Sequence, residues 1–130
     1  MAASICPEWS ELAKQQALIL AYQGIYHYFG KVKEAPTQDQ WEKELKERRP
    51  LFVTLLKEGH LRGCIGTLVA AVELGESIPI YAQKAATEDF RFPVLQLSEL
   101  DSIQIEISIL GESQKVEFNS EADLYSKITP

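Results

Sequence analysis

The feature that most constrains the fold is a strict alternation of apolar and polar residues late in the sequence. Ile103, Ile105, Ile107 and Ile109 occupy every second position, and Gln104, Glu106 and Ser108 lie between them. Because successive side chains of a β-strand point to opposite faces, this pattern predicts a strand with one buried face and one solvated face. Half-buried strands of this kind are typical of antiparallel sheets, since parallel sheets are usually covered on both faces.

A β-hairpin is predicted upstream of that strand. The segments 51–57 and 60–68 are both rich in apolar residues, and Gly59 between them adopts a positive φ at little cost. The second segment contains Gly63 and Gly66. Glycine within a strand usually marks a bulge, or a place where another backbone or a ligand approaches closely.

The N-terminal part of the sequence predicts a long amphipathic helix. Residues 9–29 place four large apolar residues on one helical face, and Ser10 is suited to cap the first turn. His27 lies off this face and is expected to be solvated. The predicted core residues of this helix are Leu18, Tyr22, Ile25 and Phe29.

Two shorter helices are predicted between this helix and the alternating strand. Thr37 and Gln40 form a capping-box pattern, and the charged segment 41–48 after it is expected to be a short helix with a solvated face. A third helix is predicted from Ser77, as its N-cap, to about Asp89. This helix carries a narrow stripe of small residues, which permits close approach to a sheet.

The order of these elements favours an α+β fold, with a mainly antiparallel sheet and flanking helices. A strand over 115–118 and a helix over 120–128 are predicted to complete the chain. At 130 residues the expected organisation is a single domain.

Composition argues against several classes of protein. The chain has 13 basic and 19 acidic residues, and no basic run exceeds the pair Arg48-Arg49, so nucleic acid is not expected as the main partner. The two cysteines, Cys6 and Cys64, do not form a disulfide framework or a recognised metal-ligand spacing, so no metal site is predicted. No segment resembles a signal peptide or a membrane span, and we therefore expect a cytoplasmic protein that is not in a membrane.

Cys64 is the main candidate for chemistry. Because side chains alternate along a strand, Arg62 is predicted to lie on the same face as Cys64, and a neighbouring cation favours the thiolate, which is the nucleophilic form. Backbone N–H groups near Gly63 or Gly66 could stabilise a developing negative charge. The other interpretation is that Cys64 is a small buried core residue, as free cysteines often are. On spacing alone, both interpretations stay open.

A second candidate group lies at the end of the third predicted helix. Glu88 and Asp89 are adjacent acids at a helix C-terminus, where the helix dipole disfavours negative charge. Such a conflict indicates either a functional role or a salt-bridge cluster with Arg91 or Arg62. We predict that both groups converge on one cleft. The predicted catalytic residues are Cys64, Arg62 and Asp89, and the predicted binding residues are Gly63, Gly66, Glu88 and Arg91.

These segments resemble the AMMECR domain family, the proteins called protein A of AmmeMemoRadiSam systems. The resemblance rests on residues 52–55, 61–66, 85–93 and 105–110, in the same order as in the family. Val94 stands where family members usually have a second proline, and family domains continue past Pro130. The resemblance therefore implies a two-lobed AMMECR-like domain over residues 1–130 that lacks the usual C-terminal portion. It also implies work beside Memo-like and radical-SAM proteins, and it names no cofactor.

Two functions follow from these observations. In the first, the protein is a cysteine-centred catalytic or small-molecule-binding protein that acts on a small-molecule or protein substrate. In the second, it is a non-catalytic regulatory or protein-interaction module, in which the strand around Cys64 forms a docking groove. Because a missing C-terminal portion would leave a sheet edge or apolar face uncovered, we also expect a homodimer or an aggregation-prone monomer.

Overall fold

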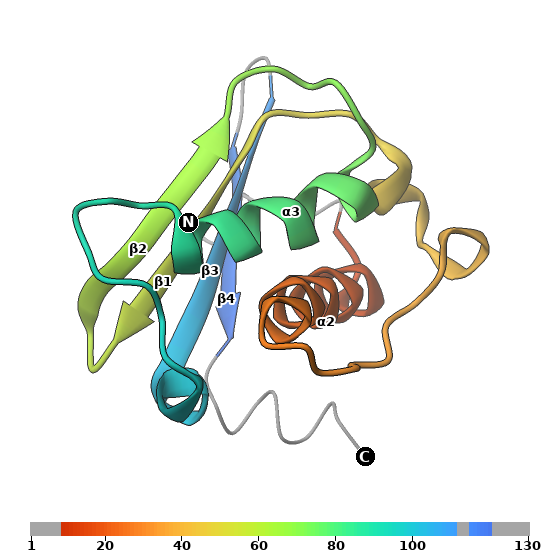
Figure 1. Cartoon of the computed structure of the whole chain (residues 1–130). Helices are drawn as coiled ribbons and strands as arrows, with labels where there is room; N and C mark the ends of the chain where they lie inside the picture. The colour runs from red at the N-terminus through yellow and green to blue at the C-terminus, as the bar shows by residue number, and fades with distance from the viewer. Residues whose placement is uncertain (1–8, 112–114, 121–130) are drawn as a thin grey trace.

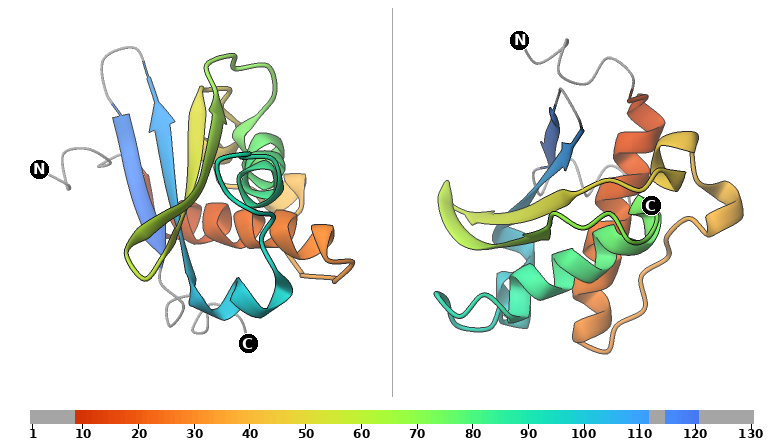
Figure 2. Two further views of the ribbon diagram at one scale, coloured as in Figure 1. Left: turned by 60° about the vertical axis from the view of Figure 1, so that its left-hand side comes forward. Right: turned by 90° about the horizontal axis from the view of Figure 1, so that it is seen from above.

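The computed structural model describes residues 9–111 and 115–120, which form a sheet covered on one face by helices (Figures 1 and 2). The four strands are antiparallel and lie in the order β2-β1-β3-β4. The α+β fold with an antiparallel sheet is therefore confirmed. The elements are α2 (Glu11–Tyr28), η1 (Gln38–Gln40), η2 (Lys43–Lys46), β1 (Leu51–Lys57), β2 (His60–Thr67), α3 (Leu74–Thr87), η3 (Leu97–Ser102), β3 (Ile103–Leu110) and β4 (Lys115–Ser120), where η denotes a 3₁₀-helix.

The alternating isoleucines form the inner face of β3, as predicted. All four are fully buried, and the residues between them are half-buried. β3 pairs with β1, where Val53 lies opposite Ile107. α3 packs on β1 and β2, and α2 packs on α3, β3 and β4. The apolar core lies between this sheet face and the two helices.

The predicted hairpin is confirmed, with a two-residue turn. Glu58 and Gly59 have φ values of 52° and 79°. Positive φ at both central positions is the signature of the type I′ turn, whose twist matches that of the flanking strands.

A β-bulge interrupts the hairpin and corrects one expectation about its faces. Leu55 pairs with Gly63, whereas Leu56 pairs with Leu61, so that Arg62 is an extra residue on β2. An extra residue breaks the period-2 alternation on which the prediction relied. Arg62 and Cys64 therefore do not share one face through simple alternation, and their side chains contact different partners.

The N-terminus of α2 is capped as predicted. The Ser10 hydroxyl accepts a 3.0 Å hydrogen bond from the Ala13 N–H. The Ser10 N–H donates in turn to the Glu44 carboxylate at 3.0 Å. A carboxylate at this end of a helix is also favoured by the helix dipole.

The prediction for the charged segment 41–48 is wrong in two respects. Only the short 3₁₀-helix η2 forms there, and Glu44 is buried rather than solvated. The physical reason is tertiary. Glu44 binds the start of α2 and Leu45 enters the core, so that these contacts fix the backbone more strongly than helix propensity does.

The third helix is confirmed in its end but not in its start. α3 begins at Leu74, with Glu73 as the N-cap, about one turn before the predicted start. Ser77 is not the cap but lies inside the first turns, where its hydroxyl donates to the Leu74 carbonyl at 3.4 Å. Pro79 consequently lies within the helix rather than in its first turn.

The remaining predictions concern the C-terminal part. The strand predicted over 115–118 is found as β4. The helix predicted over 120–128 and the residue Cys6 lie outside the described residues. Within the described part of the chain, no helix combines the length and the apolar composition needed to cross a bilayer.

Candidate functional site around Cys64

Cys64 lies on β2, which is an edge strand among the described strands, and its side chain is half-buried. Thr54 of β1 is its pairing partner, and the Thr54 Oγ1 atom lies 3.2 Å from the Cys64 Sγ atom. The Cys64 backbone N–H donates to the Asp89 Oδ2 atom at 3.0 Å. Asp89 comes from the turn after α3, so the two sequence blocks meet at this point.

Asp89 is the centre of the hydrogen-bond network. Its side chain is only 5% exposed. It accepts from the Arg91 backbone N–H at 3.1 Å, from Arg91 Nε at 2.9 Å and from an Arg91 terminal nitrogen at 2.7 Å. The bonds from Arg91 hold the pKa of the Asp89 carboxyl well below its usual range; burial opposes them, and the Cys64 N–H acts in the same direction as Arg91. Asp89 is therefore ionised and held firmly in place.

Arg91 is the cation of this network and is bound to Asp89. Its guanidinium forms the two-pronged pair with Asp89, and its central carbon lies 5.4 Å from the centre of the Phe92 ring. Hydrogen bonding to Asp89 raises the pKa of Arg91 despite some desolvation, and the negative charge of Asp89 raises it further. More than half of the Arg91 side chain, 58%, remains exposed. The guanidinium is thus fixed on its Asp89 side and open to solvent elsewhere.

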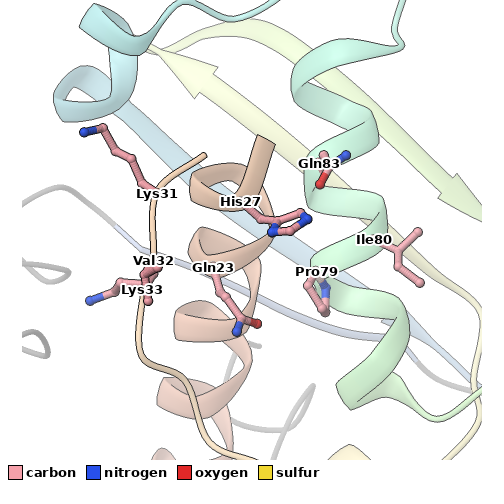
Figure 3. Close-up of a pocket in the computed structure, with 9 residues that line it drawn as sticks. Gln23, His27, Lys31, Val32, Lys33, Pro79, Ile80 and Gln83 are labelled. Atoms are coloured by element: carbon pink, nitrogen blue, oxygen red, sulfur yellow. The ribbon is translucent and has the colours of Figure 1, made fainter. Parts of the chain in front are cut away.

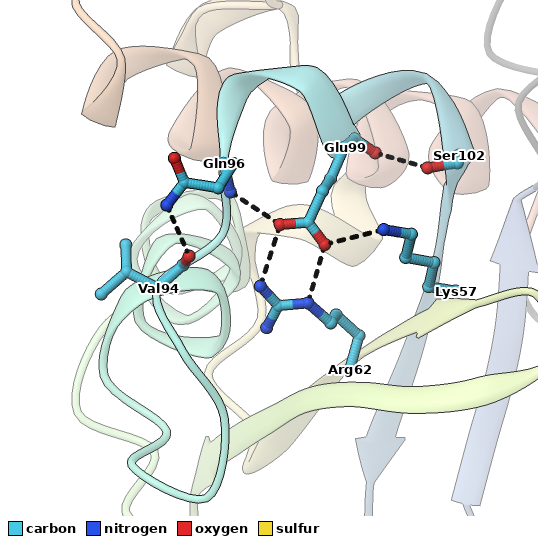
Figure 4. Close-up of polar contacts among 6 residues, drawn as sticks. All are labelled: Lys57, Arg62, Val94, Gln96, Glu99 and Ser102. Carbon is cyan, nitrogen blue, oxygen red and sulfur yellow. Dashed lines mark hydrogen bonds and ion pairs between the residues drawn. The ribbon is translucent and has the colours of Figure 1, made fainter.

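Arg62 belongs to a separate cluster (Figure 4). Its Nε and a terminal nitrogen donate to the two oxygens of Glu99, at 2.9 and 3.0 Å, and Lys57 donates to the same carboxylate at 3.1 Å. These bonds, those from Arg62 above all, lower the pKa of Glu99 to about 2, although burial opposes them. The Arg62 and Glu99 side chains are 12% and 13% exposed. This cluster fastens the tip of the β1–β2 hairpin to η3.

The structure therefore brings together Cys64, Asp89 and Arg91 from the two predicted groups. Arg62 binds Glu99 instead, and Glu88 is an exposed residue that pairs with Lys84 at 3.4 Å. The predicted salt-bridge cluster at the helix end exists, between Asp89 and Arg91. The catalytic and binding roles of all these residues stay predictions.

The comparison with known families covers both the strand that carries Cys64 and the turn that carries Asp89 and Arg91. Residues 18–130 match the family model described as AMMECR1. The chain belongs to the AMMECR1 family. The match includes β2 with Cys64 and the turn with Asp89 and Arg91.

Relatives of this AMMECR1 chain occur in archaea and bacteria. It is 43% identical over 83 residues to a protein of Methanothermobacter thermautotrophicus, a match that covers 64% of this chain and 43% of that protein. It is 43% identical over 100 residues to a Thermotoga maritima protein, with 75% and 57% covered. The chain spans about half the length of these relatives.

A solved structure shows the same family fold. The crystal structure of an uncharacterized protein from Pyrococcus horikoshii matches with a TM-score of 0.59 and 31% identity, over 77% of this chain and 49% of that one. Family membership thus accounts for the fold.

Both glycines next to Cys64 have packing reasons in this AMMECR1 chain. A Cβ atom on Gly63 would lie 2.2 Å from the Ala85 carbonyl oxygen of α3. A Cβ atom on Gly66 would lie 2.2 Å from the Leu51 carbonyl oxygen of β1. Such distances are far too short for carbon and oxygen, so glycine is needed for close backbone approach at both positions. The small-residue face of α3 lies directly on β2 as a result.

The sequence reasoning missed three residues near these clusters. Thr54 contacts the thiol, and Glu99 binds Arg62. Phe90, between Asp89 and Arg91, is 99% exposed. Counting the hairpin register from the turn would have placed Thr54 opposite Gly63, one position away from Cys64, because the bulge was not visible in the sequence. Among the described residues, no group of three or more His, Cys, Asp and Glu side chains is arranged to hold a metal ion.

Proposed function

We propose that this AMMECR1-family chain is a cysteine-centred catalytic or small-molecule-binding protein, with Cys64 as the group that engages the substrate. The observation that carries the proposal is the single Asp89 carboxylate that binds both the Cys64 backbone and the Arg91 guanidinium. It holds the backbone of the thiol-bearing residue and a fixed, half-exposed cation in one site. A thiol beside a cation is the arrangement in which cysteine acts as a nucleophile.

The proposed roles follow from the contacts. Cys64 is the nucleophile or the binding thiol, and Thr54 orients it through their 3.2 Å contact. Arg91 receives the negatively charged part of the substrate, because its guanidinium keeps free surface and N–H donors beyond those used by Asp89. Asp89 is a positioning residue, since it is nearly buried and reaches the substrate only through its partners.

The other predicted residues support the site from further away. Gly63 and Gly66 let α3 and β1 approach the strand that carries Cys64. Arg62 holds the hairpin to η3 through Glu99. Glu88, exposed beside Asp89, is the remaining binding candidate. No cofactor is assigned to this arrangement.

We also propose the cellular setting that the family resemblance implies. The chain works in the cytoplasm beside Memo-like and radical-SAM proteins, on a small-molecule or protein substrate, and forms a homodimer. Support comes from the family match over residues 18–130. Sedimentation of the purified chain, alone and mixed with a purified Memo-like or radical-SAM protein, tests each association. A single species at the monomer mass in every mixture rejects them.

One observation favours the alternative, a non-catalytic interaction module. The Phe90 ring is 99% exposed at the turn that also carries Asp89 and Arg91. Exposed aromatic residues are frequent anchors of protein interfaces. In this alternative Arg91 and Phe90 contact a partner protein together, and the thiol is only a half-buried packing residue.

Thiol reactivity separates the two functions. In a Cys6→Ser background, Cys64 is the only cysteine, and its rate of reaction with iodoacetamide is measured at pH 7 in the folded chain and in urea. The proposal expects faster alkylation in the folded chain, although Cys64 is half-buried there. Slower alkylation in the folded chain than in urea supports the interaction module and rejects the nucleophile.

A second measurement, the stability of a Cys64 variant, tests whether the residue mainly serves packing. Cys64→Ala is expected to lower the free energy of unfolding by only about 1 kcal/mol, since it removes one half-buried sulfur atom. A loss several times larger would show that the residue mainly serves packing.

A further inference from the structure

We propose that a pocket between α2 and α3 binds a small organic anion that carries an apolar chain. The pocket has a volume of about 400 Å³, within the range of roughly 300–1,000 Å³ that is typical of small-molecule sites. Its lining shares no residue with the Cys64, Asp89 and Arg91 group, so this inference is independent of the proposed function.

Two backbone features build the pocket. α2 and α3 meet at Gly24 and Pro79, where a Cβ atom on Gly24 would lie 2.1 Å from the Pro79 carbonyl oxygen. Gly30, with a φ of 72°, ends α2 and allows the following segment, 31–33, to run back beside the helix (Figure 3). The pocket is therefore bounded by α2, α3 and this returning segment.

The charge of the lining points to an anion. The pocket is lined by one histidine and two lysines, His27, Lys31 and Lys33, together with two neutral amides, Gln23 and Gln83. None of its lining residues is acidic, although the whole chain has 19 acidic residues and a net charge of −6. Cationic donors on a lining that contributes no carboxylate of its own favour a carboxylate or phosphate group.

The polar side chains at the pocket come from three different segments. In Figure 3 the His27 ring projects from α2 toward α3, and Gln83 extends from α3. Lys31 and Lys33 lie on the returning segment, with their ammonium groups directed away from α3. The Lys31 ammonium sits on a flexible four-carbon stem with three donors, so that a bound anion can draw it inward.

The C-terminal end of α2 does not oppose an anion strongly. A helix C-terminus normally presents free carbonyl oxygens, which repel negative charge. Here the Tyr26 carbonyl accepts N–H groups from Phe29 and Lys31, and the His27 carbonyl accepts the Gly30 N–H. The N–H groups of the segment after α2 therefore already bind these carbonyl oxygens, which weakens their repulsion of an anion.

Apolar side chains at the pocket define the rest of the ligand. Val32 is 95% exposed and Ile80 is 48% exposed, and Pro79 also lines the pocket. Covering exposed apolar surface is favourable in proportion to its area. A ligand with a short hydrocarbon chain next to its acidic group satisfies both parts of the pocket.

The test is an NMR titration of the ¹⁵N-labelled chain with four probes. Hexyl phosphate and hexanoate carry both features, hexylammonium carries the chain with the opposite charge, and inorganic phosphate carries only the charge. We expect saturable shifts at the amides of Gly24, His27, Lys31 and Gln83 with one or both hexyl anions at about 10 mM or less. The tighter of the two identifies the acidic group. Hexylammonium should cause no saturable shifts at these amides, and inorganic phosphate should bind at least about tenfold more weakly.

Charge-reversal variants provide the matched control. Lys31→Glu should weaken binding of the better anion by roughly tenfold or more, because it replaces a donor with a repelling charge. Lys43→Glu makes the same change in net charge on an exposed residue of η2, outside the pocket, and should leave binding within about twofold. Absence of saturable binding by both anions, equal binding of hexylammonium, or equal weakening by the two variants would overturn the proposal. Equal binding of inorganic phosphate would overturn its apolar part.

Discussion

The Cys64 backbone N–H and the Asp89 carboxylate are joined by a 3.0 Å hydrogen bond across 25 residues of sequence. The same carboxylate holds the Arg91 guanidinium, so that one nearly buried group fixes the positions of a thiol-bearing strand and a cation. The geometry of the site thus depends on Asp89 more than on any direct contact between Cys64 and Arg91.

Replacing Asp89 should therefore destabilise the chain. Asp89→Asn removes the charge that binds Arg91 and weakens the bond to the Cys64 N–H, and we expect a loss of about 2–3 kcal/mol in the free energy of unfolding. Urea denaturation at pH 7 measures this loss. Glu88→Gln is the control, since its side chain is 56% exposed and its neutralisation should change stability by less than about 0.5 kcal/mol. Equal effects of the two variants would contradict the central position of Asp89.

Stability should fall in acid, and Glu99 should account for much of the fall. The folded-state pKa of Glu99 is lowered to about 2, and that of an unfolded glutamate is about 4.3. The stabilisation is thus present above the unfolded value and is lost as the pH falls toward the folded one; its size is on the order of 3 kcal/mol. Asp89, with a pKa lowered by Arg91, acts in the same direction.

Glu99→Gln isolates that contribution. At pH 7 the free energy of unfolding should be higher for the natural chain than for this variant. The difference should shrink steadily as the pH falls from about 5 to 2. Urea titrations at several pH values give the curve. A difference that does not change over this interval would show that the Glu99 carboxylate is not stabilised by its partners in the folded chain.

The two cations on Glu99 should contribute unequally. Arg62→Met removes a nearly buried, two-pronged partner, and we expect a loss of about 2–4 kcal/mol. Lys57→Met removes a partner whose side chain is 37% exposed, and the expected loss is below about 1 kcal/mol. Thermal unfolding of the two variants compares them directly. A larger loss from Lys57→Met would reverse the assignment of Arg62 as the main clamp between the hairpin and η3.

Gly63 should tolerate no side chain. Gly63→Ala places a methyl group 2.2 Å from a backbone oxygen of α3, which flexible side chains cannot relieve, and a loss of about 2–4 kcal/mol is expected. Gly59→Ala, at a φ of 79° with open space around it, should lose only about 1 kcal/mol through backbone strain. Chemical denaturation of both variants distinguishes a steric clash from strain. A Gly63→Ala chain as stable as Gly59→Ala would contradict the close packing of α3 on β2.

Elements defined by local patterns were predictable from the sequence. The isoleucine alternation, the Ser10 cap and the turn at Gly59 each rest on contacts within a few residues, and all three are found in the structure. The same holds for the capping box of Thr37 and Gln40. The order of these elements then predicted the antiparallel α+β fold as a whole.

Features that depend on distant contacts were not predictable in the same way. The bulge at Arg62 has no local signal beyond the glycine that follows it, and it moves the guanidinium to Glu99. In the sequence Glu44 is one more charge in a run expected to be solvated, and its bond to Ser10 spans 34 residues. The link from Asp89 to Cys64 was expected only as a general convergence, because spacing cannot specify which atoms meet.

The most direct test of the proposed site compares two alkylating reagents that differ in charge. In the Cys6→Ser background, the rates of reaction of Cys64 with anionic iodoacetate and neutral iodoacetamide are measured at pH 7 in the natural chain, in Arg91→Gln and in Arg48→Gln, an exposed control. If Arg91 guides negatively charged ligands to Cys64, the iodoacetate-to-iodoacetamide ratio should fall by about fivefold in Arg91→Gln, equivalent to about 1 kcal/mol, and stay unchanged in Arg48→Gln. An identical ratio in all three chains would contradict a site in which Arg91 and Cys64 act together.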